Sequence, residues 1–192
     1  METLVFASRV SGLGDARYFA GMGVRWLGIV ALPDQLGYMA PERFREIAGW
    51  VAGVEFILET DGASLPVDFT GLSQSYGTAK FLVRPDQCEA AEASGIKYGV
   101  RFDVDADVIP SNASPEFILI RSVSTAHFKR YNCPILLTSE QPRELLEDWL
   151  GQDELTGESS GSARGLWVMG SAEEKPGIKE YPAAELLEWL ED

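Results

Sequence analysis

The chain has 192 residues, 45% of them hydrophobic, and a formal net charge of −14 at pH 7. This length suits one domain with a sizeable core, so we expect a single domain over residues 1–192. The strong negative charge argues against nucleic acid or an anionic membrane as a partner, because both are bound by clustered Lys and Arg. Apolar runs are too short to span a membrane, and the N-terminal residues do not resemble a signal peptide, so we expect a cytoplasmic protein.

Short apolar runs alternate with amphipathic stretches along the chain. Most of the runs are continuously apolar, which is typical of parallel strands buried on both faces. We expect eight strands, at residues 4–8, 26–31, 54–59, 80–84, 98–102, 117–121, 135–138 and 166–170. Helices are expected from "GDARYFAGMG", "APERFREIAGWV", "RPDQCEAAEASG", "QPRELLEDWLG" and "YPAAELLEWLED".

This order of elements predicts a compact (β/α)₈ barrel, with a doubly wound open sheet as the alternative. The connections after the third and fifth strands, "TDGASLPVDFTGLSQSYGTA" and "DVDADVIPSNASPE", look too short for full helices. We expect loops or single turns there, so that some helices of the barrel are shortened or missing, and "VDFTGLS" could itself be the fourth strand. The polar stretch "GQDELTGESSGSARG" is expected to form a mobile loop before the last strand.

Both ends of the chain resemble a known family. "GDARYFAGMGVRWLGIV" with "YMAPERFREIAGWV", and later "GLWVMGSAEEKPGIKE", are similar to segments of phosphoribosylanthranilate isomerases, enzymes of tryptophan biosynthesis. The likeness covers about residues 4–60 and 165–192. It implies a (β/α)₈ barrel and an Amadori rearrangement of an aminoaldose to an aminoketose, which needs a general base and a general acid on opposite sides of the substrate.

The functional positions that the resemblance implies carry other residues here. The family's base is a Cys that ends the first strand, and we match it to Ala7, whose methyl group cannot take a proton. The family's acid is an Asp that ends the sixth strand, and it matches Arg121, which cannot act as an acid near neutral pH. Gly37 stands where an Arg is expected, and residues 138–140 and 169–171 replace the family's phosphate-binding loops.

These departures predict a non-catalytic paralogue that binds a small anion or a protein partner at the C-terminal mouth of the barrel. The alternatives are a divergent isomerase that uses other acid and base groups, or an enzyme of another reaction. We expect no cofactor, and either a monomer or a homodimer.

Four arginines end predicted strands, and in a parallel barrel all of these ends lie on the face that holds the active site. They are Arg9, Arg84, Arg101 and Arg121. Because Arg binds carboxylates and phosphates in a bidentate manner, they are candidates for an anion site, together with Gly170 and Ser171. The alternative is that each arginine is paired with an acidic neighbour such as Asp103 or Asp105.

Other reactive residue types are read as structural. Ser8 needs a nearby base to act as a nucleophile, and the only histidine, His127, is expected on a helix away from the mouth. Cys88 is expected on a helix, packed or partly exposed, and Cys133 at the opposite face of the barrel.

Asp103, Asp105 and Asp107 alternate as at the start of a calcium loop. However, Val108 and Ser114 replace the Gly and Glu that such a loop requires, so we expect no metal.

Overall fold

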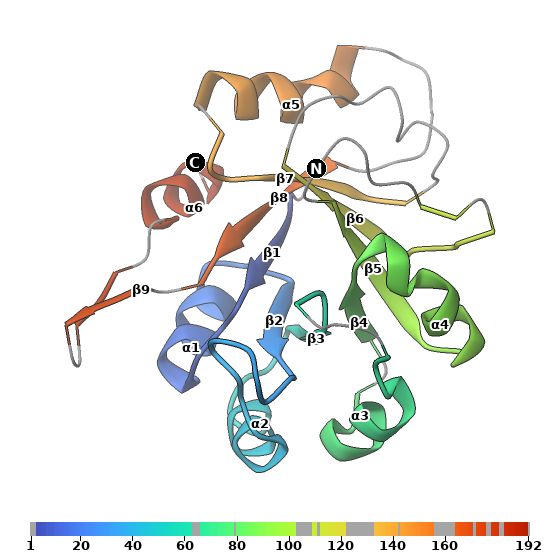
Figure 1. Ribbon diagram of the computed structural model, residues 1–192. Helices are drawn as coiled ribbons and strands as arrows, with labels where there is room; N and C mark the ends of the chain where they lie inside the picture. The colour runs from blue at the N-terminus through green and yellow to red at the C-terminus, as the bar shows by residue number, and fades with distance from the viewer. Residues whose placement is uncertain are drawn as a thin grey trace.

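The computed structural model describes residues 3–62, 66–78, 80–102, 109–110, 112–121, 133–141, 143–155, 164–170, 172–175, 178–180 and 183–191. Eight parallel strands form a closed barrel in chain order (Figure 1), which confirms the predicted (β/α)₈ architecture. They are β1 (Leu4–Ser8), β2 (Trp26–Val30), β3 (Glu55–Glu59), β4 (Lys80–Val83), β5 (Lys97–Phe102), β6 (Phe117–Ile120), β7 (Ile135–Thr138) and β8 (Arg164–Met169).

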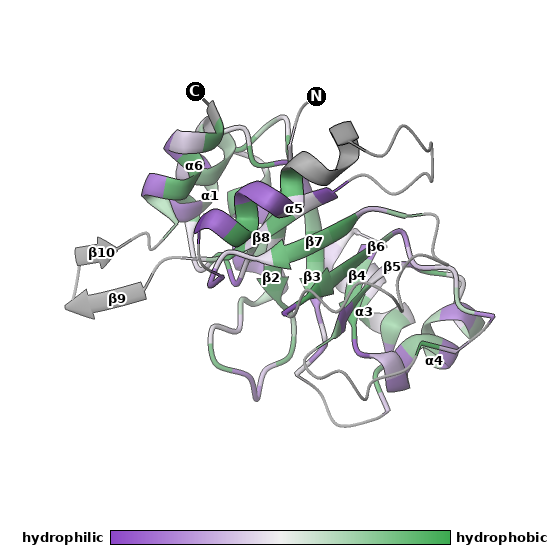
Figure 2. Ribbon diagram, turned by 90° about the horizontal axis from the view of Figure 1, so that it is seen from above, coloured by the Kyte–Doolittle hydropathy of each residue, from purple (hydrophilic) through white to green (hydrophobic). Residues whose placement is uncertain are grey.

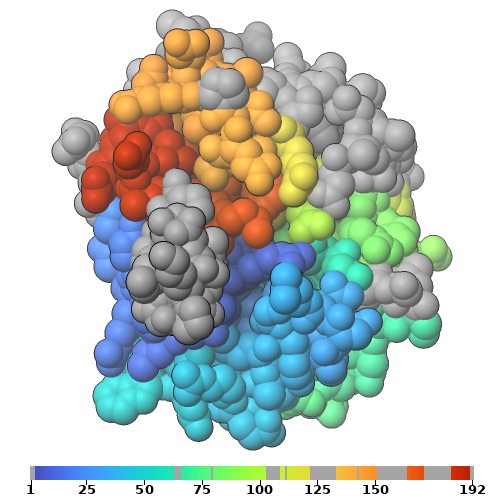
Figure 3. All heavy atoms as spheres, turned by 60° about the vertical axis from the view of Figure 1, so that its left-hand side comes forward, coloured from blue at the N-terminus to red at the C-terminus, as the bar shows by residue number. Residues whose placement is uncertain are grey.

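The first and last strands close the barrel by pairing directly. All five residues of β1 pair in parallel with β8, from Leu4 opposite Gly165 to Ser8 opposite Met169. Figure 3 shows the result on the surface, where N-terminal segments in blue lie against C-terminal segments in orange and red. The two ends of the chain that carry the family resemblance are therefore neighbours in space.

Helices surround the barrel (Figure 1). They are α1 (Leu13–Gly21), α2 (Pro41–Ala48), α3 (Phe69–Tyr76), α4 (Cys88–Ala93), α5 (Arg143–Leu155) and α6 (Ala184–Glu191), and a short 3₁₀ turn (Pro85–Gln87) precedes α4. Pro41 in the first turn of α2 has the backbone angle that a helix start requires and no N–H to leave unpaired. No helix in the described part of the chain is both long enough and apolar enough to cross a membrane.

The connection after β3 differs from the prediction, because it contains the helix α3 instead of a loop, a single turn or a strand. The Asp68 side chain caps this helix by accepting the backbone N–H of Gly71 at 2.9 Å. Gly77 ends it in the left-handed conformation (φ 72°), and Phe69 and Tyr76 are buried on its inner side.

Other connections were predicted with mixed success. Between β5 and β6 the described residues, 109–110 and 112–116, contain no helix, in line with the expectation of a short connection. Helix α5 continues to Leu155, so residues 151–155 of the expected loop are helical instead, and residues 156–163 lie outside the described residues. An unpredicted antiparallel pair, β9 (Ala172–Lys175) and β10 (Ile178–Glu180), lies between β8 and α6. The helix expected after the sixth strand, with His127, lies outside the described residues.

The hydrophobic core has two parts, because successive side chains of a strand point to opposite faces. One part fills the barrel and consists of Phe6, Trp26, Ile57, Leu82, Phe117, Leu119, Leu136 and Trp167. The other lies between the barrel and the helices and includes Ala7, Ala16 and Phe19. The strands are accordingly hydrophobic along most of their length, as the green of β7 and β8 in Figure 2 illustrates.

Candidate functional site at the barrel mouth

The residues that fill the barrel show which side chains at the C-terminal ends of the strands face the mouth. Leu82 of β4 and Leu119 of β6 lie inside the barrel, and so does Gly99 of β5, whose Cβ would overlap the Phe117 ring. Two residues further along each chain segment, at the C-terminal end, a side chain again faces inward. These positions are Arg84, Arg101 and Arg121.

Two of these arginines are paired with carboxylates. Arg84 donates two hydrogen bonds to Asp86, from Nε to Oδ1 at 3.0 Å and from Nη2 to Oδ2 at 2.8 Å. This pairing lowers the pKa of Asp86 below its ordinary value. Arg101 forms an ion pair with Asp61, which is 3% exposed. The alternative of acidic partners thus holds for both, but with Asp61 and Asp86; Asp103 and Asp105 lie outside the described residues.

Arg121 differs from the other two because it is exposed. Its guanidinium carbon lies 5.9 Å from the centre of the Trp167 indole ring. The Trp167 N–H in turn donates to the carbonyl oxygen of Ile120 at 3.0 Å, which fixes the ring beneath the arginine. An arginine over an aromatic ring is held in place by a cation–π contact while it remains accessible to solvent.

Arg9 has an unusual backbone conformation. Its φ of 56° is left-handed, and it is the one non-glycine residue with positive φ in the described part of the chain. This turn directs its backbone N–H to Oε1 of Glu59 at 2.6 Å. Gly170 packs against the same turn: its N–H donates to the carbonyl oxygen of Ser8 at 2.7 Å, and a Cβ there would overlap that backbone. The Gly170 N–H is therefore bonded within the barrel, and Ser171 lies outside the described residues.

Ser8, and not Ala7, is the residue of β1 that faces the mouth. Ala7 is fully buried in the layer between the barrel and the helices. Ser8 follows the inward-facing Phe6 by two residues, and its hydroxyl lies 3.0 Å from each carboxylate oxygen of Glu59. Ala7 therefore faces the helices and not the mouth.

Glu59 is a site residue that the sequence analysis missed. It ends β3 with only 2% of its surface exposed, and burial raises its pKa to about 7, with a further rise from the charge of Asp61. The N–H of Arg9 and the hydroxyl of Ser8 act in the opposite direction but do not cancel this rise. A carboxyl group with this pKa can both accept and donate a proton near neutral pH.

Gly28 of β2 provides the space for this carboxylate. A Cβ at position 28 would overlap Oε1 of Glu59 and come within 2.8 Å of the Phe6 ring. The signal in the sequence is a Glu and a Gly at inward positions of neighbouring apolar strands, "EFILE" and "WLGIV". It could be recognised only after the register of the two strands was known.

Both cysteines are buried and free, so Cys88 is packed and not partly exposed. Burial raises the pKa of the Cys88 thiol to about 12 and that of Cys133 to about 11, so neither forms a thiolate at neutral pH. Within the described ranges, no three His, Cys, Asp or Glu side chains are grouped closely enough to hold a metal ion. Asp107 and His127 belong to the segments that are not described.

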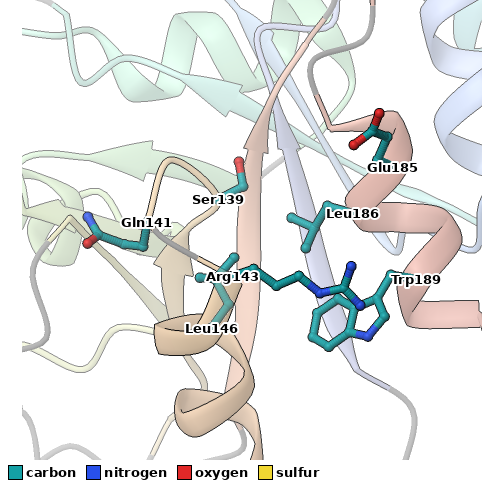
Figure 4. Close-up of a pocket in the computed structure, with 7 residues that line it drawn as sticks. All are labelled: Ser139, Gln141, Arg143, Leu146, Glu185, Leu186 and Trp189. Carbon is teal, nitrogen blue, oxygen red and sulfur yellow. The ribbon is translucent and has the colours of Figure 1, made fainter.

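A small cavity of about 200 Å³ lies outside the barrel, between the start of α5 and α6 (Figure 4). Arg143 extends across it to within 4.8 Å of the Trp189 ring centre and pairs with Glu147 at 2.9 Å. Gln141, at its edge, donates to the carbonyl oxygen of Arg121 at 2.8 Å. The cavity therefore borders the β6–β7 side of the mouth, and its own arginine is already paired.

No protein-family model and no curated protein sequence matches the chain. Solved structures do match over nearly the whole length. The phosphoribosylanthranilate isomerase of Thermus thermophilus has a TM-score of 0.64 and 18% identity, over 97% of this chain and 96% of that one. The enzyme of Pyrococcus furiosus has a TM-score of 0.61 and 16% identity, over 98% of this chain and 96% of that one. Monomers of the dimeric enzyme of Thermotoga maritima have a TM-score of 0.63 and 15% identity, over 98% of this chain and 97% of that one. The chain therefore has the barrel fold of the phosphoribosylanthranilate isomerases.

Proposed function

We propose that this phosphoribosylanthranilate isomerase-like barrel binds a small anion at its C-terminal mouth and does not catalyse the isomerase reaction. The observation that carries the proposal is the shared inward register of Arg84, Arg101 and Arg121 at the ends of three neighbouring strands. Arginine forms charge-assisted, bidentate hydrogen bonds to carboxylates and phosphates.

The charges of the mouth support this proposal in a chain that carries a net charge of −14. Arg9 is close enough for its charge to lower the pKa of Glu59, and with the three inward arginines it gives four positive charges. Among the described residues they face three carboxyl groups, those of Glu59, Asp61 and Asp86. Four arginines on one face of so acidic a chain concentrate positive charge there, which favours an anionic ligand.

The geometry of the two family positions supports the absence of the isomerase reaction. A base on β1 has to face the mouth, so its place corresponds to Ser8, whose hydroxyl is engaged with Glu59. The acid position at the end of β6 holds Arg121, and a guanidinium group does not serve as a general acid. The pair of opposed proton-transfer groups that the rearrangement needs is therefore missing at those two positions.

The anion site is tested by titrating the protein with inorganic phosphate in a calorimeter. Arg121→Gln should weaken binding by about tenfold or more, since a hydrogen bond to a charged group contributes about 1.5–3 kcal/mol. Arg43→Gln is the matched control, because Arg43 is exposed on α2 and pairs there with Glu46. Absence of binding by the wild type, or an equal loss in the control, would refute the site.

The absence of the reaction is tested by complementation. A strain that lacks phosphoribosylanthranilate isomerase should fail to grow without tryptophan when it expresses this chain in folded form. Growth would overturn this half of the proposal.

A second candidate function is that of an enzyme whose proton acceptor has moved from β1 to β3. The observation that favours it is Glu59, a buried carboxyl group with a pKa of about 7 in contact with Ser8. Under this candidate the strain would grow, and Glu59→Gln would abolish that growth without unfolding the protein. The same experiment therefore separates the two functions.

A further inference from the structure

The floor of the mouth holds two carboxylates that differ in how their charge is compensated. Glu59 and Asp61 are both almost completely buried and follow the inward-facing Ile57 at intervals of two residues. Asp61 is paired with the guanidinium of Arg101. Glu59 accepts hydrogen bonds from the hydroxyl of Ser8 and the backbone N–H of Arg9, and both of these donors are uncharged.

The surroundings of Glu59 can hold its neutral form as well as its ionised form. On the β2 side it faces the backbone of Gly28 and the ring of Phe6, which offer no charge and no donor side chain. The hydroxyl of Ser8 can donate to a carboxylate or accept from a carboxylic acid. Glu59 can therefore take up a proton and keep its hydrogen bond to Ser8, while Oε1 still accepts from the Arg9 N–H, which lowers the cost of protonation in this apolar site.

An anion that enters the mouth brings a negative charge close to these carboxyl groups. Asp61 has a compensating ion pair, and Asp86 is half-exposed and held by Arg84. The described charged groups that act on Glu59 are Asp61, which opposes its ionisation, and Arg9, which favours it. Of these three carboxyl groups, Glu59 is thus the one whose ionised form is least stabilised when the negative charge of the anion arrives.

We propose that Glu59 takes up a proton when a small anion binds at the mouth, so that this site binds the anion and the proton together. The inference rests on the proposed anion site and adds its regulation. Glu59 already has a pKa of about 7, so the coupling operates in the physiological range of pH. By linkage, the affinity for an anion of constant charge falls as the pH rises, by up to about tenfold per pH unit.

The test is calorimetry of the whole chain with sulfate, whose own charge is constant near neutral pH. At about pH 8, the binding heats in Hepes and in Tris should differ by the difference between the ionisation enthalpies of the two buffers, multiplied by about one proton taken up. The affinity for sulfate should be at least about fivefold higher at pH 6.5 than at pH 8. Glu59→Gln should remove both effects. Glu46→Gln, an equivalent change at an exposed position of α2, should leave both in place.

Ser8→Ala is a second variant that keeps the carboxyl group. It removes a hydrogen bond that lowers the pKa of Glu59, so the fall in sulfate affinity should move to higher pH. Sulfate binding with buffer-independent heats, or with the same pH dependence in Glu59→Gln, would overturn the coupling and leave the anion site intact. If sulfate fails to bind the wild type at every pH, the proposed anion site itself is wrong and the coupling falls with it.

Discussion

Replacing Glu59 by Gln should stabilise the protein at alkaline pH and change its stability little at acid pH. Gln has the size of the neutral acid and retains an oxygen for the Arg9 N–H. The pKa of Glu59 rises from 4.5 to about 7 on folding, chiefly because the side chain is buried. Between these values the native state holds the proton and the unfolded state has released it, so the free energy of unfolding falls as the pH rises.

The size of this effect follows from the pKa difference. Each tenfold change in proton affinity is worth about 1.4 kcal/mol, so ionisation of Glu59 costs the wild type about 3 kcal/mol at pH 8 relative to pH 4. The variant lacks this loss, and all other titrating groups are shared, so the difference between the two proteins isolates Glu59. It should be near zero below about pH 4, develop between about pH 4.5 and 7, and then stay constant.

Urea unfolding at a series of pH values measures this difference. Glu46→Gln serves as the control and should differ from the wild type by the same small amount at every pH, because Glu46 is exposed. A difference between Glu59→Gln and the wild type that is constant with pH would refute the reasoning. So would a variant less stable than the wild type at pH 8, since the ionised carboxylate would then gain more from Ser8 and Arg9 than it loses on burial.

Three further predictions concern the interior. Gly28→Ala should cost about 2–4 kcal/mol in urea unfolding, because the new methyl group displaces the buried carboxylate, whereas Gly14→Ala in α1 has open space and should be neutral or stabilising by about 1 kcal/mol. Trp26→Phe removes an indole N–H that is buried without a partner among the described residues, whereas the N–H of Trp149 donates to a strand carbonyl at 3.1 Å. Trp26→Phe should therefore lower the melting temperature less than Trp149→Phe does. Cys88 should react with a disulfide reagent at pH 8 only on the timescale of unfolding; fast reaction in the native state would contradict its burial.

The strands were predictable from the sequence because burial on both faces leaves a plain signal of continuous apolar runs. Helix α3 was not predicted, although Asp68 and Gly77 are ordinary start and stop residues. Between them only Phe69 and Tyr76 are fully buried, so the apolar stripe was too sparse to show a helical period. The helix is stabilised by what it packs against, as Phe69 does on Phe81 of β4, and this information is absent from the segment itself.

The register of the arginines was also predictable in principle, since alternation is a property of every strand. The partner of Arg101 was not. Asp61 follows β3 and Arg101 lies in β5, with β4 between the two strands. The two side chains meet because both point into the barrel. A pairing of this kind depends on the tertiary fold, whereas the nearest acidic residues in the sequence suggested Asp103 and Asp105.

The end of β1 shows why a single residue matters when a site is inferred from a motif. Aligning the family's motif with residues 5–8 placed Ala7 at the base position, but Phe6 fills the barrel and thereby fixes Ser8 as the inward residue. The mouth then offers a hydroxyl group in place of a methyl group, and that hydroxyl is bonded to Glu59 on the strand two places away. Gly28, on the strand between, clears the way for the bond. The Ser8 hydroxyl on β1, the Gly28 backbone on β2 and the Glu59 carboxyl group on β3 are therefore parts of one arrangement, and its titratable member is Glu59.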